Sequence, residues 1–377
     1  MSNYTLLQLK ILAITPKITA GISIPCDLFI IKEVLRDYKR KRAKPVDRAL
    51  LGMSAIDFFA STGWFMSTWL VPRGSQNTIY AVGNTQTCTY QGFLLQFAIG
   101  APLYNCSLAL YCLLAIKYKW TNENIIKIEP WIHGGIMAFS SVTAVAGVIL
   151  QLFNQVTSVC WINEHPQGCN SGSSDIACER GNNAWIYGLL WFYCPLWLCI
   201  MLTLAALVLI CQHVRRTFQQ SQRHDFVSQL RKRKSFKNRI QAARNKPFLN
   251  TNDVAKQAIL YSICFFITWA PSTTWSIMGW FNSPKFWLDF FSSFFEPLQG
   301  FMNFLIFIRP RKDIRARLYR DFCRIFPLGG ESQANDCFSN FSEVSGDDQQ
   351  TANKAKDNNS VQEESQETGV ADDLNTP

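Results

Sequence analysis

Seven apolar stretches, each long enough to cross a bilayer as a helix, dominate this chain of 377 residues. They cover residues 9–31, 49–71, 88–116, 130–153, 184–211, 257–281 and 286–308. About 20 apolar residues span the hydrocarbon core as a helix, and inside a bilayer every backbone amide must be satisfied within its own segment. The third to sixth stretches contain no Lys, Arg, Asp or Glu. The sequence therefore predicts an all-α membrane protein, with a seven-transmembrane helix bundle over residues 9–308.

The segments between these stretches alternate sharply in their content of basic residues. Thirty Lys and Arg fall in four of them, 32–48, 117–129, 212–256 and 309–330. Only three fall in the other four, 1–8, 72–87, 154–183 and 282–285. Because basic loops stay on the cytosolic side, we expect an integral multi-pass protein of the plasma membrane. Its N-terminus, residues 1–8, is then extracellular and its C-terminus cytosolic.

The net charge of +10 combines a basic body with an acidic tail. A basic protein can bind nucleic acid, but here the basic residues share one membrane face, so anionic membrane lipid is the expected partner and nucleic acid is not. Residues 309–326 place Arg and Lys on one side and Ile314, Leu318 and Phe322 at helical spacing on the other. This pattern predicts a short amphipathic cytosolic helix at the membrane surface. Residues 327–377, acidic and poor in apolar residues, are expected to be a disordered cytosolic tail.

Four of the thirteen cysteines fall at the predicted outer face, and they are Cys88, Cys160, Cys169 and Cys178. Outer loops mature in an oxidising compartment, where an even number of cysteines indicates disulfides. Four cysteines allow three pairings, and their positions alone do not choose among them. Cys323 lies on the predicted amphipathic helix, where acylation would add membrane anchoring, so we consider it a candidate acylation site.

Nothing in the sequence indicates enzymatic chemistry, a cofactor or a metal site. The four histidines are scattered over both predicted faces, and no metal-ligand spacing is present. A retinal protein would need a lysine in the middle of the seventh stretch, whereas Lys285 lies at its edge. We therefore expect a protein that is not an enzyme.

Four short motifs together resemble those of seven-helix G protein-coupled receptors, most closely the slime-mould cyclic-AMP receptors, with secretin-like features. They are Cys-Thr-Tyr-Gln-Gly-Phe at 88–93, Cys-Trp-Ile at 160–162, Trp-Ala-Pro at 269–271 and Pro-Leu-Gln-Gly-Phe-Met-Asn at 297–303. The resemblance covers roughly residues 5–325. It implies a receptor that passes the signal of an extracellular small molecule or short peptide to a heterotrimeric G protein.

The resemblance also implies roles for single residues. The secretin-like pattern pairs Cys88 with Cys160 and leaves Cys169 with Cys178. The proline of the sixth stretch, Pro271, corresponds to an activation hinge, and Trp269 to a switch that responds to ligand. Two further switch residues are implied, Asp57 in the second stretch and Asn303 in the seventh as its partner. A buried carboxylate such as Asp57 is costly in a membrane and by default indicates function.

The same resemblance implies two binding sites, one for the ligand and one for the G protein. A ligand cavity would take Gln91 from the third stretch and Glu296 and Gln299 from the seventh. The G-protein face would include Lys117 and Tyr118, which stand where many receptors end the third helix with Asp-Arg-Tyr or Glu-Arg-Tyr. It would also include the basic run Arg231, Lys232, Arg233 and Lys234.

A seven-helix transporter or channel for a small solute is the alternative. It would require internal repeats or polar residues along the whole bundle. No internal repeat is visible, and Asp57, Asn105, Glu296 and Asn303 are too few to decide. Nucleotide exchange on G proteins, measured beside solute flux, separates the two functions.

Overall fold

The computed structural model describes residues 4–40, 44–169, 177–231, 248–281 and 286–325. The chain divides into two compact units, residues 1–307 and 308–377. The described residues are mostly helical, with one short antiparallel hairpin. This confirms the predicted all-α class.

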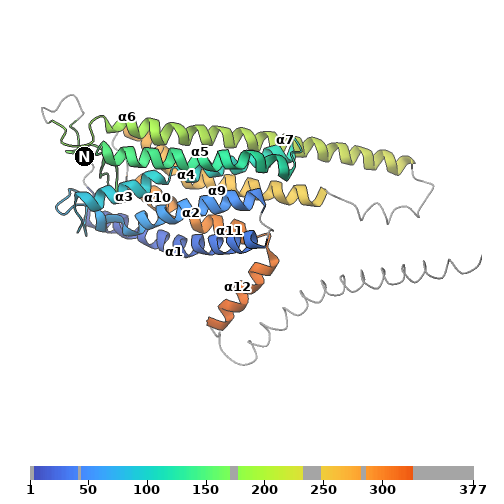
Figure 1. The fold of residues 1–377 in the computed structure, drawn as a ribbon, viewed down its shortest axis with the longest axis horizontal. Helices are drawn as coiled ribbons and strands as arrows, with labels where there is room; N and C mark the ends of the chain where they lie inside the picture. Colours follow the sequence, from blue (N-terminus) through green and yellow to red (C-terminus); the bar gives the residue numbers. More distant parts are fainter. Residues whose placement is uncertain (1–3, 41–43, 170–176, 232–247, 282–285, 326–377) are drawn as a thin grey trace, which may run out of the picture. The chain divides into compact units, whose positions relative to one another are not determined.

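The helices of the first unit lie side by side, nearly along one common direction (Figure 1). In chain order they are α1 (Leu6–Lys39), α2 (Pro45–Met66), η1 (Ser67–Leu70), α3 (Thr85–Phe97), α4 (Gly100–Ile116), α5 (Asn122–Ile149), α6 (Ala184–Gly188), the π-helical turn η2 (Leu189–Tyr193), α7 (Cys194–Arg231), α9 (Phe248–Phe281), α10 (Phe286–Phe295) and α11 (Gln299–Ile308). The hairpin consists of β1 (Phe153–Gln155) and β2 (Cys160–Ile162).

Four segments of the described chain are long and apolar enough to cross a membrane. They are Pro45–Leu70, Thr85–Ile116, Asn122–Ile149 and Ala184–Thr217. This agrees with a membrane protein, whereas the number of seven spans stays a prediction. Among the remaining predicted spans, α1 carries Lys10, Lys17 and Asp27, and the last stretch is interrupted between α10 and α11, where Pro297 cannot donate a backbone hydrogen bond.

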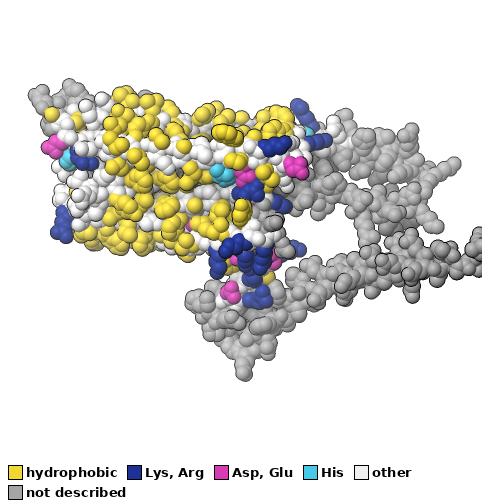
Figure 2. Space-filling model, viewed as in Figure 1, with side chains coloured by type: hydrophobic (Ala, Val, Ile, Leu, Met, Phe, Trp, Pro, Cys, Tyr) yellow, Lys and Arg dark blue, Asp and Glu magenta, His cyan; other side chains and the backbone are white. Residues whose placement is uncertain are grey.

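The surface of the bundle carries a broad band of hydrophobic side chains between its two ends (Figure 2). Large apolar side chains of several helices are exposed, among them Ile18, Val142, Leu198 and Met201. In the same view the Lys and Arg side chains gather mainly toward one end of the bundle. A band of this kind between polar ends is what contact with lipid requires.

The fourth predicted span differs from the helix that forms. The sequence places its end at Phe153, but α5 ends at Ile149 and Phe153 begins β1. Phe153 is fully buried, and a Cβ at Gly92 of α3 or Gly147 of α5 would lie 2.4 Å from its side chain. Two glycines on neighbouring helices therefore make the space for this ring. Phe153 occupies that space as the first residue of β1.

In the second unit, α12 (Lys312–Ile325) forms within the predicted amphipathic stretch 309–326. Cys323 belongs to this helix, but its side chain lies outside the described residues. The acidic tail predicted for 327–377 also lies outside them. The longer helices α7 and α9 extend beyond their apolar stretches, as far as Arg231 and from Phe248.

Candidate functional site

A cavity of about 120 Å³ opens inside the first unit, at the end of the bundle that carries the β-hairpin. Since a single water needs roughly 10–15 Å³ by this measure, the cavity has room for a small organic molecule. Its walls come from α2, α3, α4, η2, α9, α10 and α11, and residues 156–161 of the hairpin cover it. Four residues singled out from the sequence line it: Asp57, Trp269, Glu296 and Gln299.

The cover over the cavity is fixed by a disulfide between Cys88 and Cys160, with the two Cα atoms 5.2 Å apart. It joins the first turn of α3 to β2 and confirms the implied pairing. β2 pairs with β1 in antiparallel register, with Gln155 opposite Cys160 and Asn154 opposite Trp161. The hairpin therefore cannot move away from α3 while the disulfide is intact.

Gln91, expected at the ligand cavity, has a different position. Its side chain is fully buried one turn after Cys88, and its amide donates at 2.9 Å to the carbonyl oxygens of both Gly63 and Ser67. Its carbonyl accepts from the Cys160 backbone N–H at 2.9 Å. Three of its hydrogen bonds thus connect α3 to the end of α2 and to β2, so the residue supports the disulfide-bonded cover.

The second disulfide joins Cys169 to Cys178, nine positions apart in the chain, and also agrees with the implied pairing. Glu164 lies close to both sulfur atoms in a grouping that resembles a metal site. Bonded cysteines offer no thiolate, so we assign no metal there.

Arg180 holds this loop to the hairpin. Its Nε donates to Asn154 Oδ1 at 2.9 Å and its Nη2 to Thr89 Oγ1 at 3.4 Å. Burial lowers the pKa of the Arg180 guanidinium from its usual value, yet an arginine stays charged at neutral pH. The loop is thereby attached to both β1 and α3.

A π-helical turn, which the sequence analysis did not predict, shapes one wall of the cavity. In η2, Phe192 and Tyr193 both line the cavity, although they are consecutive residues. Pro195, two residues after Tyr193, has no N–H to donate to the Trp191 carbonyl, which instead accepts from Gln96 Nε2 at 3.4 Å. Such single π turns occur frequently at functional sites.

Trp161 of the hairpin packs against this wall. Its ring centroid lies 4.9 Å from that of Phe192 and 5.8 Å from that of Tyr193. Its indole N–H donates to Gln96 Oε1 at 3.1 Å. The tryptophan of the Cys-Trp-Ile motif is therefore part of the cavity lining as well as of the cover.

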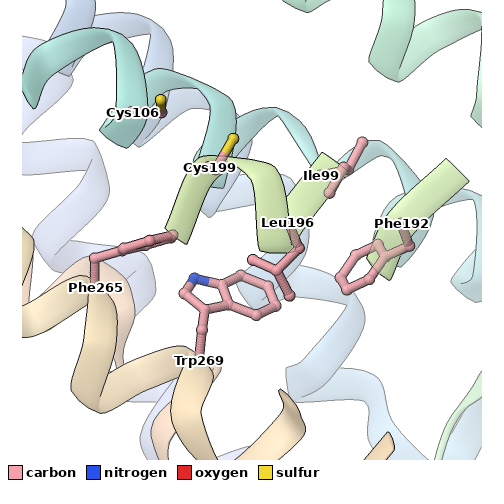
Figure 3. Packing of buried hydrophobic residues seen from close by; sticks show 7 residues of the cluster. All are labelled: Ile99, Cys106, Phe192, Leu196, Cys199, Phe265 and Trp269. Carbon is pink, nitrogen blue, oxygen red and sulfur yellow. The ribbon is translucent and has the colours of Figure 1, made fainter. Parts of the chain in front are cut away.

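Trp269 belongs to a cluster of buried hydrophobic residues beside the cavity. Figure 3 shows its indole pointing from α9 toward Leu196, with Phe265 on one side and Phe192 on the other. Its Nε1 donates to Gln299 Oε1 at 3.0 Å, which connects α9 to α11. Two residues later Pro271 lies inside α9. The predicted hinge and switch are thus adjacent to the cavity.

A cluster of buried polar residues connects α1, α2 and α11. Asn303 Nδ2 donates to Asp57 Oδ2 at 2.9 Å, so the expected partners are in contact. Asp27 of α1, which the sequence analysis did not single out, interacts electrostatically with Asp57 and is fully buried. A Cβ at Gly300 would lie 2.4 Å from Asp27 Oδ2, so glycine is required where α11 approaches this carboxyl.

Asp289 is a further cavity residue, which is not among the candidates named from the sequence. It lines the cavity and accepts a hydrogen bond from the Tyr4 hydroxyl, which comes from the start of the chain. Its residue type and its place one turn into α10 gave no signal of this contact, because Tyr4 is 285 positions away.

The basic end of the bundle contains a network that spans three helices. Arg48 donates from Nε and Nη2 to the two carboxylate oxygens of Glu129, at 2.6 and 2.5 Å. His133 lies 3.4 Å from the same carboxylate and 2.8 Å from the Tyr104 hydroxyl. From the sequence, Arg48 is only one of the basic residues of segment 32–48, and nothing indicates this network.

The predicted G-protein face is described only in part. Lys117 is the cap residue that follows α4, and its ammonium lies 5.1 Å from the centroid of the Tyr118 ring. Arg231 ends α7, with its side chain outside the described residues, and Lys232, Arg233 and Lys234 lie outside them entirely.

No protein-family model matches the chain, and no curated protein is significantly similar to it. The function has to be argued from the cavity itself.

Proposed function

We propose that this protein is a G protein-coupled receptor that transmits the signal of an extracellular small molecule or short peptide to a cytosolic heterotrimeric G protein. Anionic membrane lipid is the second proposed partner, at the basic end of the bundle. The proposal includes seven membrane-spanning helices, with the disulfide-bonded hairpin outside and the basic end in the cytosol.

One observation carries the proposal: Trp269, which lines a ligand-sized cavity, belongs to a helix that contains a proline. Trp269 lines the cavity, binds Gln299 of α11, and lies two residues before Pro271. A ligand that contacts Trp269 differently in two conformations shifts the balance between them. Bending at Pro271 then moves the far end of α9 toward or away from a G protein.

The test is a nucleotide-exchange assay on the purified protein in lipid nanodiscs, with a panel of heterotrimeric G proteins. A library of metabolites, nucleotides and short peptides is added on the outer side. Acceleration of exchange by at least one compound supports the receptor. Solute flux into proteoliposomes in the absence of accelerated exchange supports the transporter or channel instead.

Replacing Pro271 by Ala should lower stimulated nucleotide exchange by about tenfold, the effect of roughly 1.4 kcal/mol on the balance of two conformations. Alanine restores the backbone hydrogen bond that Pro271 cannot make to Ile267, and so opposes bending. Ligand binding should change much less, because Pro271 is not among the residues that line the cavity.

The matched control is Pro130→Ala, which removes a proline from inside α5 at an exposed position. Equal loss of exchange in both variants would show that proline removal acts on stability rather than on a hinge at Pro271.

A further inference from the structure

The cavity contains an excess of acidic side chains. Three carboxyl groups line it, those of Asp57, Asp289 and Glu296, and no Lys, Arg or His is among the described residues of its wall. Two basic residues at this end of the bundle have other partners: Lys17 donates to the Met66 carbonyl, and Arg180 to Asn154. The walls themselves therefore supply no positive charge to balance the acids.

Two of the three acids already have hydrogen-bond donors from the protein. Asp57 accepts from Asn303, and Asp289 from Tyr4. Glu296 lies in the break between α10 and α11, and no salt bridge to it is present within the described ranges. A carboxylate removed from water is stabilised by a nearby cation, so Glu296 is the cavity acid best placed to pair with a positively charged ligand.

The rest of the lining suits a cation that carries an apolar part. Six aromatic rings line the cavity, those of Trp64, Trp161, Phe192, Tyr193, Trp269 and Trp275. The faces of Trp and Tyr rings attract ammonium groups and also accept apolar groups.

Two buried polar groups provide independent signs of a ligand. Ser272 and Gln299 line the cavity and are 6% and 5% exposed. The Ser272 hydroxyl and the Gln299 Nε2 have no hydrogen-bond partner among the residues described. Buried polar atoms are nearly always paired, so these two are available to a bound molecule.

We infer that the cavity binds a small organic cation, an aromatic or alkyl amine whose ammonium group pairs with Glu296 and whose apolar part lies among the tryptophans. The inference rests on the proposed function only for its physiological meaning, since binding itself does not require a G protein. It gives the unidentified ligand a chemical class.

A charge series of nearly equal size tests the inference on the full-length protein in nanodiscs. The probes are phenethylamine, 2-phenylethanol and phenylacetate, which are cationic, neutral and anionic at pH 7. Isothermal titration calorimetry and the thermal-unfolding midpoint should show binding of phenethylamine at least tenfold tighter than of 2-phenylethanol, and no binding of phenylacetate. Equal affinities for the cation and the alcohol, or preference for the anion, would overturn it.

The variant Glu296→Gln should weaken phenethylamine binding by roughly 30-fold or more, the usual loss when one member of a buried charge pair is removed. It should leave 2-phenylethanol binding within about threefold, which shows that the variant is folded. The control Glu179→Gln removes an acid whose side chain is 73% exposed and should change neither affinity.

The cation site and the receptor proposal can be contradicted independently of each other. Amine binding without nucleotide exchange would support the cation site and contradict the receptor proposal. Exchange stimulated only by anionic or neutral compounds, with no binding of the amine, would support the receptor and contradict the cation site.

Discussion

Replacing Cys88 by Ala should lower the free energy of unfolding by about 4 kcal/mol, whereas Cys169→Ala should lower it by about 2.5 kcal/mol. The difference follows from the length of chain that each disulfide closes, 72 residues for Cys88–Cys160 and nine for Cys169–Cys178. Unfolding in detergent, followed without reductant, measures both values. Surface delivery in cells should fall in the same order.

The two members of one disulfide should behave as a unit. Cys160→Ala should match Cys88→Ala, and the double variant should be no less stable than either, because the second change removes a bond that is already lost. Cys194→Ala, at an exposed free cysteine, is the control and should have little effect. Similar losses for both disulfides would show that loop length does not decide their contribution.

The first disulfide should also influence the cavity. Cys160 is hydrogen-bonded through its backbone to Gln91, and Trp161 beside it lines the cavity. Because β2 carries both Cys160 and Trp161, loss of the Cys88–Cys160 bond frees the hairpin that covers the cavity. It also removes the constraint that the disulfide places on the unfolded chain. The ligand affinity of a surviving variant should therefore fall together with its stability.

Some features of this protein could be predicted from the sequence because they depend on local composition. Apolar length and the placement of Lys and Arg indicate a helical membrane protein without knowledge of any contact. Four outer cysteines indicate two disulfides, and the motif around Cys88 and Cys160 indicated the right pairing. The contact between Asp57 and Asn303 was also expected, as an implication of the resemblance to seven-helix receptors.

Other features depend on contacts between distant segments, and the sequence could not reveal them. The hairpin at Phe153 exists because Gly92 and Gly147, on two other helices, leave space for its ring. The interruption between α10 and α11 and the π turn before Pro195 change which side chains face the cavity. Gln91 was placed at the cavity from its position in α3, but its amide is used by α2 and β2.

The ion pair between Arg48 and Glu129, at the basic end of the bundle, is the clearest example of a contact that the sequence could not reveal. Arg48 belongs to a linker with eight basic residues, and nothing in the sequence distinguishes it from the other seven. In the structure it alone, among the described residues of that linker, reaches Glu129 of α5 with two parallel hydrogen bonds. Bidentate pairs of this kind are stronger and more specific than a single charge contact.

Replacing Glu129 by Ala should therefore destabilise the protein by about 3 kcal/mol, the usual cost of leaving one member of a buried ion pair alone. Breaking a buried ion pair usually costs roughly 3–5 kcal/mol. We expect the lower value because the Arg48 side chain is 22% exposed, while that of Glu129 is only 7% exposed. Unfolding in detergent measures the loss. Glu123→Ala in the first turn of the same helix, at an exposed position, should cost well under 1 kcal/mol.

A double-mutant cycle decides whether the pair itself carries this stability. If it does, Arg48→Ala and Glu129→Ala together should cost clearly less than the sum of the two single changes, since the second substitution removes a charge that the first left unpaired. Additive losses would mean that each side chain acts through separate contacts, such as that between Glu129 and His133. A strong coupling would show that this pair holds α2 and α5 together, in a network that also reaches Tyr104 of α4 through His133.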